Sequence, residues 1–199
     1  MARPKEFDRD EALMGAIGLF ANYGYEGTST EALLKAMGVS RQSLYDTFGS
    51  KRGLYIEAVR RYSLDSAAEF AKSLEGGVTP LGGLRRALIS HISRKDRFTN
   101  GACLGVGSIC EFGRRDPVVI AVSAEAAPLL LEPLVKTLAR AQACGEIRAD
   151  VDLQLAAEFL LTTLNGLKVN ARAGMPVKRL KEIGSMALDT LTRRSAQAQ

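Results

Sequence analysis

Apolar and polar residues follow helical spacing along nearly the whole chain, first in short patterns and then in long ones. A first helix is predicted between Asp8, a candidate N-cap, and Gly24. Two patterns of about two turns each then meet at Gly38, within residues 28–51. Residues 50–75 continue the apolar spacing without interruption, which predicts one long helix. The N-terminal part is therefore expected to be a small unit of short helices.

The rest of the chain predicts a body of longer helices. Residues 117–143 form one apolar pattern, but Pro128 and Pro133 each remove a backbone hydrogen bond, so we expect a kink or a break there. Further amphipathic helices are predicted over residues 81–98, within 101–113, over 153–173 and from Pro176 onwards. The expected fold class is all-α, with about nine helices divided between residues 1–54 and residues 55–199.

Composition is typical of a soluble globular protein and changes this picture little. Of 199 residues, 46% are hydrophobic and 25% are charged, which suffices for a buried core. The net charge of +5 favours a nucleic-acid partner only weakly, because residues 1–54 hold seven basic and seven acidic residues. The excess lies in residues 55–199, with 20 basic against 15 acidic side chains. A DNA-binding hypothesis must therefore rest on individual side chains.

Several function classes are disfavoured by the residues that the chain contains. Three cysteines without a CxxC pair, and the single histidine His91, predict neither a disulfide framework nor a metal site. The N-terminal residues lack the apolar core of a signal peptide, and no run approaches the roughly 20 apolar residues of a membrane span. A cytoplasmic protein without a membrane partner is therefore expected. No clustered carboxylates, glycine-rich phosphate loop or nucleophile motif points to an enzyme or to a cofactor.

Residues 28–51 carry the pattern of a helix-turn-helix, two short helices joined by a bend that contains glycine. In that motif the second helix enters the major groove and presents its N-terminal residues to base edges. Arginine can pair with guanine and glutamine with adenine, while serine and tyrosine suit phosphates or base edges. Leu44 and Phe48, at i and i+4, are left to hold the helix in place. The polar residues at the start of this helix are Arg41, Gln42, Ser43 and Tyr45. An adaptor or dimerisation protein, in which these helices only pack, is the alternative.

The first 60 or so residues contain several short motifs at characteristic spacing. These are Phe20 with Gly24-Tyr25, the cap Thr28-Ser29-Thr30, the bend Gly38-Val39-Ser40, and the run Leu44-Tyr45, Phe48, Lys51 and Leu54. With these motifs the segment resembles the N-terminal domain of the TetR family of bacterial transcriptional regulators. One departure is Glu31, where many relatives carry a basic or neutral residue; it either weakens a phosphate contact or only alters the helix surface.

The resemblance implies a role for each matching polar residue. Ser29 and Thr30 would face phosphates at a helix N-terminus, where backbone N–H groups favour anions. The base-reading residues would be Arg41, Gln42 and Ser43, with Tyr45 on a base or the backbone, and Thr47 and Lys51 on flanking phosphates. It also implies that residues 1–54 bind DNA and residues 55–199 bind a ligand and dimerise. The expected function is a ligand-responsive repressor that binds a palindromic double-stranded operator as a homodimer and is released by a small-molecule effector.

Two features of the helical body bear on regulation. Gly101-Ala102-Cys103-Leu104 is similar, with one residue inserted, to a branch of the family that responds to electrophiles or oxidants through a cysteine. Sensing by Cys103 is therefore an alternative trigger, although small buried thiols are the simpler interpretation. Cys103 and Cys110 are seven residues apart, which would place them on one helical face. By helix face, the candidates for the ligand pocket are His91, Cys103, Cys110 and Phe159.

The last two predicted helices are suited to dimerisation. Residues 152–173 and 176–192 form long amphipathic patterns, with Gly166 and Gly184 available for close approach of a second chain. In the TetR family two such helices from each subunit form a four-helix interface, so the resemblance implies a homodimer through this part of the chain.

Overall fold

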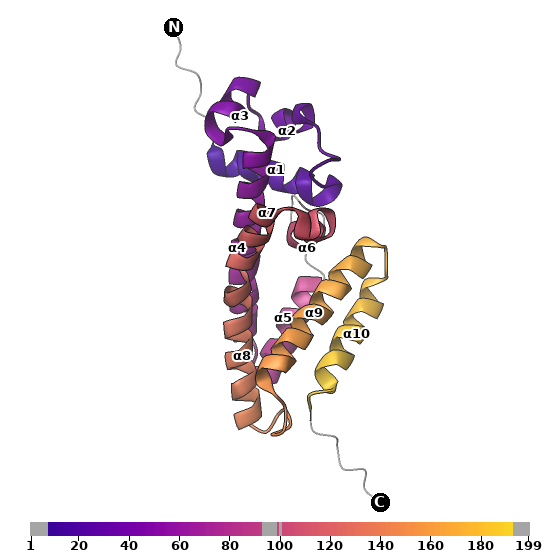
Figure 1. Cartoon of the computed structure of the whole chain (residues 1–199). Coiled ribbons are helices and arrows are strands. Elements are labelled where there is room, and N and C mark those ends of the chain that lie inside the picture. Colours follow the sequence, from indigo (N-terminus) through magenta and orange to yellow (C-terminus); the bar gives the residue numbers. More distant parts are fainter. Residues whose placement is uncertain (1–7, 93–98, 100, 193–199) are drawn as a thin grey trace, which may run out of the picture. The chain divides into compact units, whose positions relative to one another are not determined.

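The computed structural model describes residues 8–92, 99 and 101–192, and every regular element in this part of the chain is helical apart from one bridge between Ile147 and Thr192 (Figure 1). The predicted all-α fold class with an N-terminal helix-turn-helix is confirmed. The described elements are α1 (Arg9–Tyr23), α2 (Thr30–Met37), α3 (Arg41–Phe48), α4 (Lys51–Glu75), α5 (Pro80–Ile92), α6 (Leu104–Phe112), the short 3-10 helix η1 (Gly113–Arg115), α7 (Pro117–Glu125), α8 (Ala127–Ala143), α9 (Leu153–Arg172) and α10 (Val177–Asp189).

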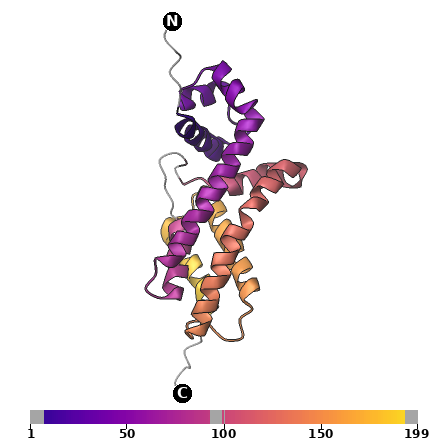
Figure 2. The same ribbon diagram turned by 90° about the vertical axis from the view of Figure 1, so that its left-hand side faces the viewer.

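The helices pack into two compact units. The first unit comprises Met1–Ser63 with Lys95–Glu125, and the second comprises Leu64–Arg94 with Ala126–Gln199. Helix α4 contributes to both units and is one uninterrupted helix (Figure 2). The predicted functional boundary after residue 54 lies inside α4, so it does not coincide with this division by packing, and it stays a prediction.

The core of the first unit is rich in aromatic rings. Tyr55 packs edge-on against Phe20, with ring centroids 4.9 Å apart, and contacts Tyr25 and Phe112 at 5.1 and 5.3 Å. Phe20 and Tyr55 are each 1% exposed. Edge-to-face contacts have preferred angles as well as distances, so the Phe20–Tyr55 pair fixes how α1 and α4 meet, and the tilted Tyr55–Phe112 pair adds a contact to α6.

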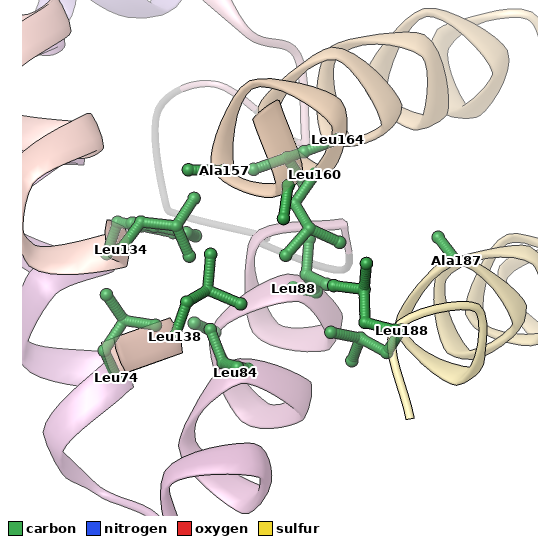
Figure 3. Close-up of a cluster of buried hydrophobic side chains, with 14 of the residues drawn as sticks. Leu74, Leu84, Leu88, Leu134, Leu138, Ala157, Leu160, Leu164, Ala187 and Leu188 are labelled. Atoms are coloured by element: carbon green, nitrogen blue, oxygen red, sulfur yellow. The ribbon is translucent and has the colours of Figure 1, made fainter. Parts of the chain in front are cut away.

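The core of the second unit is aliphatic. Figure 3 shows leucine and alanine side chains from α4, α5, α8, α9 and α10 that converge on one another. Gly184 belongs to this core, because a Cβ there would lie 3.2 Å from Ile92 Cδ1 and 3.6 Å from Leu167 Cδ1. The expectation that Gly184 lets a second chain approach is therefore wrong, since this glycine already serves packing within its own chain. Gly166 is exposed, and a Cβ there would meet nothing within 4 Å.

The apolar pattern of residues 117–143 divides into two helices at Ala126. Pro128 lies in the first turn of α8, where a missing N–H costs little, whereas Pro133 lies inside α8 without ending it. The predicted break thus lies just before the first proline. Because one expected helix is divided into α7 and α8, the described chain has one α-helix more than the sequence predicts. The predicted helix 81–98 is described as far as Ile92, and residues 93–98 lie outside the described part.

The same stretch corrects one expectation about membranes. By length and composition alone, Pro117–Ala143 is apolar enough to cross a bilayer, so the statement that no run approaches span length is wrong. One such segment is only a weak indication, because core helices of soluble proteins pass the same test. Here α8 buries Leu134 and Leu138 in the aliphatic core.

Candidate DNA-binding surface

The helices α2 and α3 begin and end at residues whose chemistry requires it. The Ser29 hydroxyl caps α2 by accepting from the Ala32 N–H at 3.1 Å. Gly38 then adopts the left-handed conformation, with φ 66° and ψ 29°, which reverses the chain at low cost. The Ser40 hydroxyl caps α3 by accepting from the Ser43 N–H at 3.1 Å. These residues confirm the helix, bend and helix that the sequence predicts.

Packing fixes which face of α3 is exposed. Leu44 is 0% and Phe48 7% exposed. Both side chains therefore hold α3 against the core of the first unit, as their spacing predicts. The Arg9 guanidinium lies 5.3 Å from the centre of the Phe48 ring and covers its outer side. Gly15 lets α1 approach α2 closely, because a Cβ there would stand 2.6 Å from the Ala36 carbonyl oxygen. The pair α2–α3 is thus tightly attached to α1.

All eight side chains predicted to contact DNA lie on α2, on α3 or at their junctions with neighbouring segments. The Ser43 hydroxyl is 2.9 Å from that of Ser40, and the Lys51 ammonium lies 4.3 Å from the centre of the Tyr25 ring. Ser43 and Lys51 therefore already contact other residues of the first unit. The exposed members of the set are Ser29, Arg41, Gln42, Tyr45 and Thr47, and the half-buried ones are Thr30, Ser43 and Lys51.

The first residue of α3 makes a contact that no sequence pattern indicates. Arg41 Nη2 donates to Glu31 Oε1 at 2.6 Å, which joins α3 to the first turn of α2. Both side chains are largely exposed. Glu31 stands out in the sequence as a departure from the family pattern, but nothing in the spacing indicates that its partner is Arg41.

A carboxylate far along the chain holds the turn before α2. Glu111 on α6 accepts hydrogen bonds from the backbone N–H groups of Tyr25 and Glu26 at 2.8 and 2.9 Å. Gly24, with φ 75°, brings the turn close to this carboxylate, because a Cβ there would lie 2.9 Å from Glu111 Oε2. More than 80 residues separate the partners, so no local sequence pattern could reveal the contact.

Two ion pairs tie α7 to the first part of α4. Arg52 binds Asp116 through both Nη atoms, and Asp116 also caps α7 by accepting from two backbone N–H groups. Hydrogen bonding to Arg52 lowers the pKa of Asp116 to about 2, with help from those backbone donors. Arg60 pairs with Glu125 at 2.8 and 3.0 Å and lowers the pKa of that carboxyl as well.

The phenol of Tyr55 is buried within reach of the electrostatic effect of Glu111 and Asp116. Its hydroxyl is buried and has no hydrogen-bond partner among the described residues. Burial raises the pKa of Tyr55, and the carboxylates of Glu111 and Asp116 raise it further, so the phenol stays neutral at physiological pH.

The four pocket candidates are distributed over both units. His91, in the second unit, is buried, with Nε2 3.3 Å from the Ser66 carbonyl oxygen and its ring edge-on to Phe70. Phe159, also in the second unit, is 42% exposed. In the first unit, α6 begins only at Leu104, so Cys103 precedes the helix, and the prediction that Cys103 and Cys110 share a helical face is wrong. Cys103 is half-buried, whereas Cys110 is exposed. Their role in ligand binding stays a prediction.

Neither a disulfide nor a metal cluster is found in the part of the chain that the structure describes. All three cysteines are free, and no three His, Cys, Asp or Glu side chains there are grouped for a metal ion.

Comparison with known proteins identifies the family. The model of bacterial regulatory proteins of the tetR family matches residues 12–58, and that of the tetracyclin repressor-like C-terminal domain matches residues 77–188. The chain is 32% identical to the uncharacterized HTH-type transcriptional regulator YezE of Bacillus subtilis, over 96% of this chain and 100% of YezE. It is 33% identical to the HTH-type transcriptional repressor ComR of Escherichia coli, over 94% of this chain and 90% of ComR.

Among solved structures, a cysteine mutant of the TetR family transcriptional regulator CifR in complex with 26-bp double-strand operator DNA has a TM-score of 0.80. It is 33% identical to this chain and covers 96% of it, with 100% of the CifR chain matched. The match of both family models, which together span most of the chain, agrees with the helix-turn-helix geometry described above. The chain therefore belongs to the TetR family of bacterial regulatory proteins, a family of helix-turn-helix transcriptional regulators and not of enzymes.

Proposed function

We propose that this protein is a transcriptional repressor that binds a palindromic DNA operator as a homodimer and is released by a small-molecule effector. The observation that carries the proposal is the division of α3 into two faces. Leu44 and Phe48 fasten the helix, while Arg41, Gln42 and Tyr45 are left exposed near its N-terminal end. The relatives ComR and CifR, respectively named a repressor and solved on operator DNA, support the same function.

The side chains on α2 and α3 divide into base readers and phosphate binders. Arg41 and Gln42 can each make two hydrogen bonds to a purine in the major groove. The Ser29 hydroxyl accepts from Ala32 N–H, so its own proton is free to be donated to a phosphate. Thr47 is exposed on α3 and Lys51 begins α4, which suits both to flanking phosphates.

Dimerisation is assigned to α9 and α10. Along α9, exposed residues recur at spacings of four and three, which is the repeat of helices that pack side by side. We call this set the α9 stripe: Leu155, Phe159, Thr162, Gly166 and Val169. On α10, Val177 and Met186 are exposed as well. Binding of such a dimer to a palindromic operator requires its two α3 helices to lie one DNA turn, about 34–36 Å, apart.

Release by an effector is assigned to α4. This helix begins beside the helix-turn-helix and ends in the second unit, where Phe70 and Leu74 join the aliphatic core. A ligand among the second-unit helices, with the buried His91 as a candidate contact, would bias α4 and change the separation of the two α3 helices. A coupling free energy of about 1–3 kcal/mol is typical of such linkage.

A thiol is the alternative trigger. Cys103 is half-buried immediately before α6, and α6 carries Glu111, which holds the turn before α2. Modification of Cys103 would therefore act on the helix-turn-helix through α6. Treatment of the purified protein with an electrophile, compared with a Cys103→Ser variant, separates this trigger from a reversible ligand.

The test of the proposed function is selection of DNA fragments by the purified protein, followed by affinity measurements on the selected sequence. Arg41→Ala and Gln42→Ala should each lose about 1–3 kcal/mol of sequence preference per bidentate contact, with fold and dimerisation retained. Arg140→Ala, an exposed arginine on α8, removes the same charge as Arg41→Ala and serves as its control. Selection of no DNA, or unchanged preference in both variants, would favour an adaptor protein instead.

A further inference from the structure

The contact between Glu31 and Arg41 ties a candidate base-reading arginine to a carboxylate on the preceding helix. Glu31 is the second residue of α2, and Arg41 is the first residue of α3. Their side chains meet across the Gly38 bend, with 2.6 Å between Arg41 Nη2 and Glu31 Oε1. The position of the arginine head is therefore set by two helices, although it belongs to only one.

The geometry leaves Arg41 able to read a base. The hydrogen bond occupies one N–H of Nη2, and a guanidinium has five N–H donors in a fixed plane. An edge with two donors remains for the O6 and N7 atoms of guanine. An arginine held in this way loses less side-chain freedom when it meets DNA than one that moves freely in solvent.

The charge of Glu31 also affects the contact that competes with base reading, which is the binding of Arg41 to DNA phosphates. An unpaired arginine at the start of α3 is attracted equally to every phosphate, and such contacts contribute affinity without sequence information. A carboxylate at 2.6 Å offsets that charge locally and would itself be repelled by the DNA backbone. It therefore weakens phosphate binding by Arg41 more than binding to a guanine edge, which depends on hydrogen-bond geometry.

We propose that Glu31 is a specificity-determining residue that positions Arg41 for a base edge and suppresses its binding to phosphates. The proposal rests on the proposed function, in which Arg41 reads DNA. It also fits the charge balance of residues 1–54, where seven acidic residues match seven basic ones. Discrimination by this unit comes from placed side chains, and Glu31 places one of them.

The experiment uses the full-length protein with Glu31→Gln, which keeps an oxygen acceptor but removes the charge. Affinity is measured for the selected operator and for a scrambled duplex of equal length, at several salt concentrations. We expect Glu31→Gln to bind the scrambled duplex about three- to tenfold more tightly, with a salt slope steeper by about one, because Arg41 gains a phosphate contact. Operator affinity should stay nearly constant, so the ratio of operator affinity to scrambled-duplex affinity should fall by about the same three- to tenfold.

Two variants make the result specific to this pair. Glu26→Gln, an exposed glutamate in the turn before α2, should change both affinities by similar and smaller factors. In an Arg41→Ala background, Glu31→Gln should leave the affinity ratio unchanged, because no arginine remains to be positioned. The thermal midpoint of each variant shows whether the pair acts only on folding.

The outcomes separate failure of this inference from failure of the proposed function. If Arg41→Ala lowers the affinity ratio and Glu31→Gln does not, Arg41 reads DNA but Glu31 does not position it, and the inference is wrong. The inference is also wrong if Glu31→Gln shifts the thermal midpoint alone. If Arg41→Ala itself leaves the ratio unchanged, the base-reading role of Arg41 fails, and the inference fails with it.

Discussion

The cores of the two units of this protein differ in the side chains that dominate them. The first unit is fixed by directional interactions, which include the edge-on ring of Tyr55, the Glu111 carboxylate on a backbone turn and the bidentate pair Arg52–Asp116. The core of the second unit is mostly leucine and alanine, whose contacts have little directionality, and its directional contacts include the edge-on pair Phe70–His91 and the Glu146 carboxylate on the Leu81 N–H. Cores of the second kind tolerate repacking while they keep their volume.

This difference matches what each unit has to do under the proposed function. Recognition of bases requires side chains held within a fraction of an ångström, which directional contacts around α1, α2 and α3 provide. A unit that accepts a ligand and transmits its presence needs packing that can adjust at small cost. Comparable changes in the two units should therefore have different consequences for DNA binding and stability.

The largest effect is expected in the aromatic core. Phe20→Ala should lower the free energy of unfolding by about 3–5 kcal/mol, because it leaves a cavity beside Tyr55 and Tyr25. Leu88→Ala, in the aliphatic core, should cost about 2–5 kcal/mol. Urea unfolding measures both costs, and operator affinity is compared where both variants are folded. If Phe20→Ala and Leu88→Ala lose operator affinity equally, the two cores do not differ in their effect on DNA binding.

The next effect concerns exposed apolar side chains, which occur in both units. Phe159→Asp, in the α9 stripe, should weaken the proposed dimer by about 2 kcal/mol or more, because it would bury a charge in the proposed apolar interface. Val118→Asp, on α7 in the first unit, changes a side chain of similar exposure and should leave the dimer intact. Sedimentation across a concentration series measures both. Loss of the dimer in the Val118 variant alone would move the interface to α7.

A smaller effect is expected at the turn before α2. Glu111→Ala leaves the Tyr25 and Glu26 N–H groups without their acceptor, which should cost about 1–3 kcal/mol of stability and weaken operator binding. Glu132→Ala, an exposed glutamate on α8, is the matched change in the second unit and should cost less than about 0.5 kcal/mol. Thermal unfolding and operator titration measure both variants. Equal losses would mean that Glu111 contributes no more than a surface charge.

Sequence predicts the local contacts of the first unit and misses the distant ones. The caps Ser29 and Ser40 and the bend at Gly38 follow from residue types at short spacing, and the structure agrees with each. The partners of Glu111 and Asp116 lie more than 60 residues away, so hydrophobic periodicity carries no trace of them. The pairing of charged side chains that are far apart in sequence can be seen only in the packed structure.

In the second unit the helix boundaries can be predicted from sequence, but the direction in which each helix faces cannot. Asp152 as a cap and Pro176 before the last helix follow from residue type, and the structure agrees. The prediction for Gly184 is wrong, because a glycine in an apolar pattern indicates close approach without saying which helix approaches. Met186 and Leu155 follow the apolar spacing and yet are exposed, since periodicity does not distinguish a core from an interface.

The smallest effect is expected in the pH dependence of stability, when Asp116 of the Arg52–Asp116 pair is replaced by the neutral asparagine. Because the folded pKa of Asp116 is about 2 and its ordinary value is 3.8, the folded state binds this proton less readily than the unfolded state. The resulting stabilisation is present in full above about pH 4 and is lost as the pH falls from about 4 toward 2. Asp116→Asn should therefore lower stability at neutral pH and flatten its decline over that window, as measured by urea unfolding at a series of pH values. Equal slopes for wild type and variant would show that the Arg52–Asp116 pair contributes nothing to acid sensitivity.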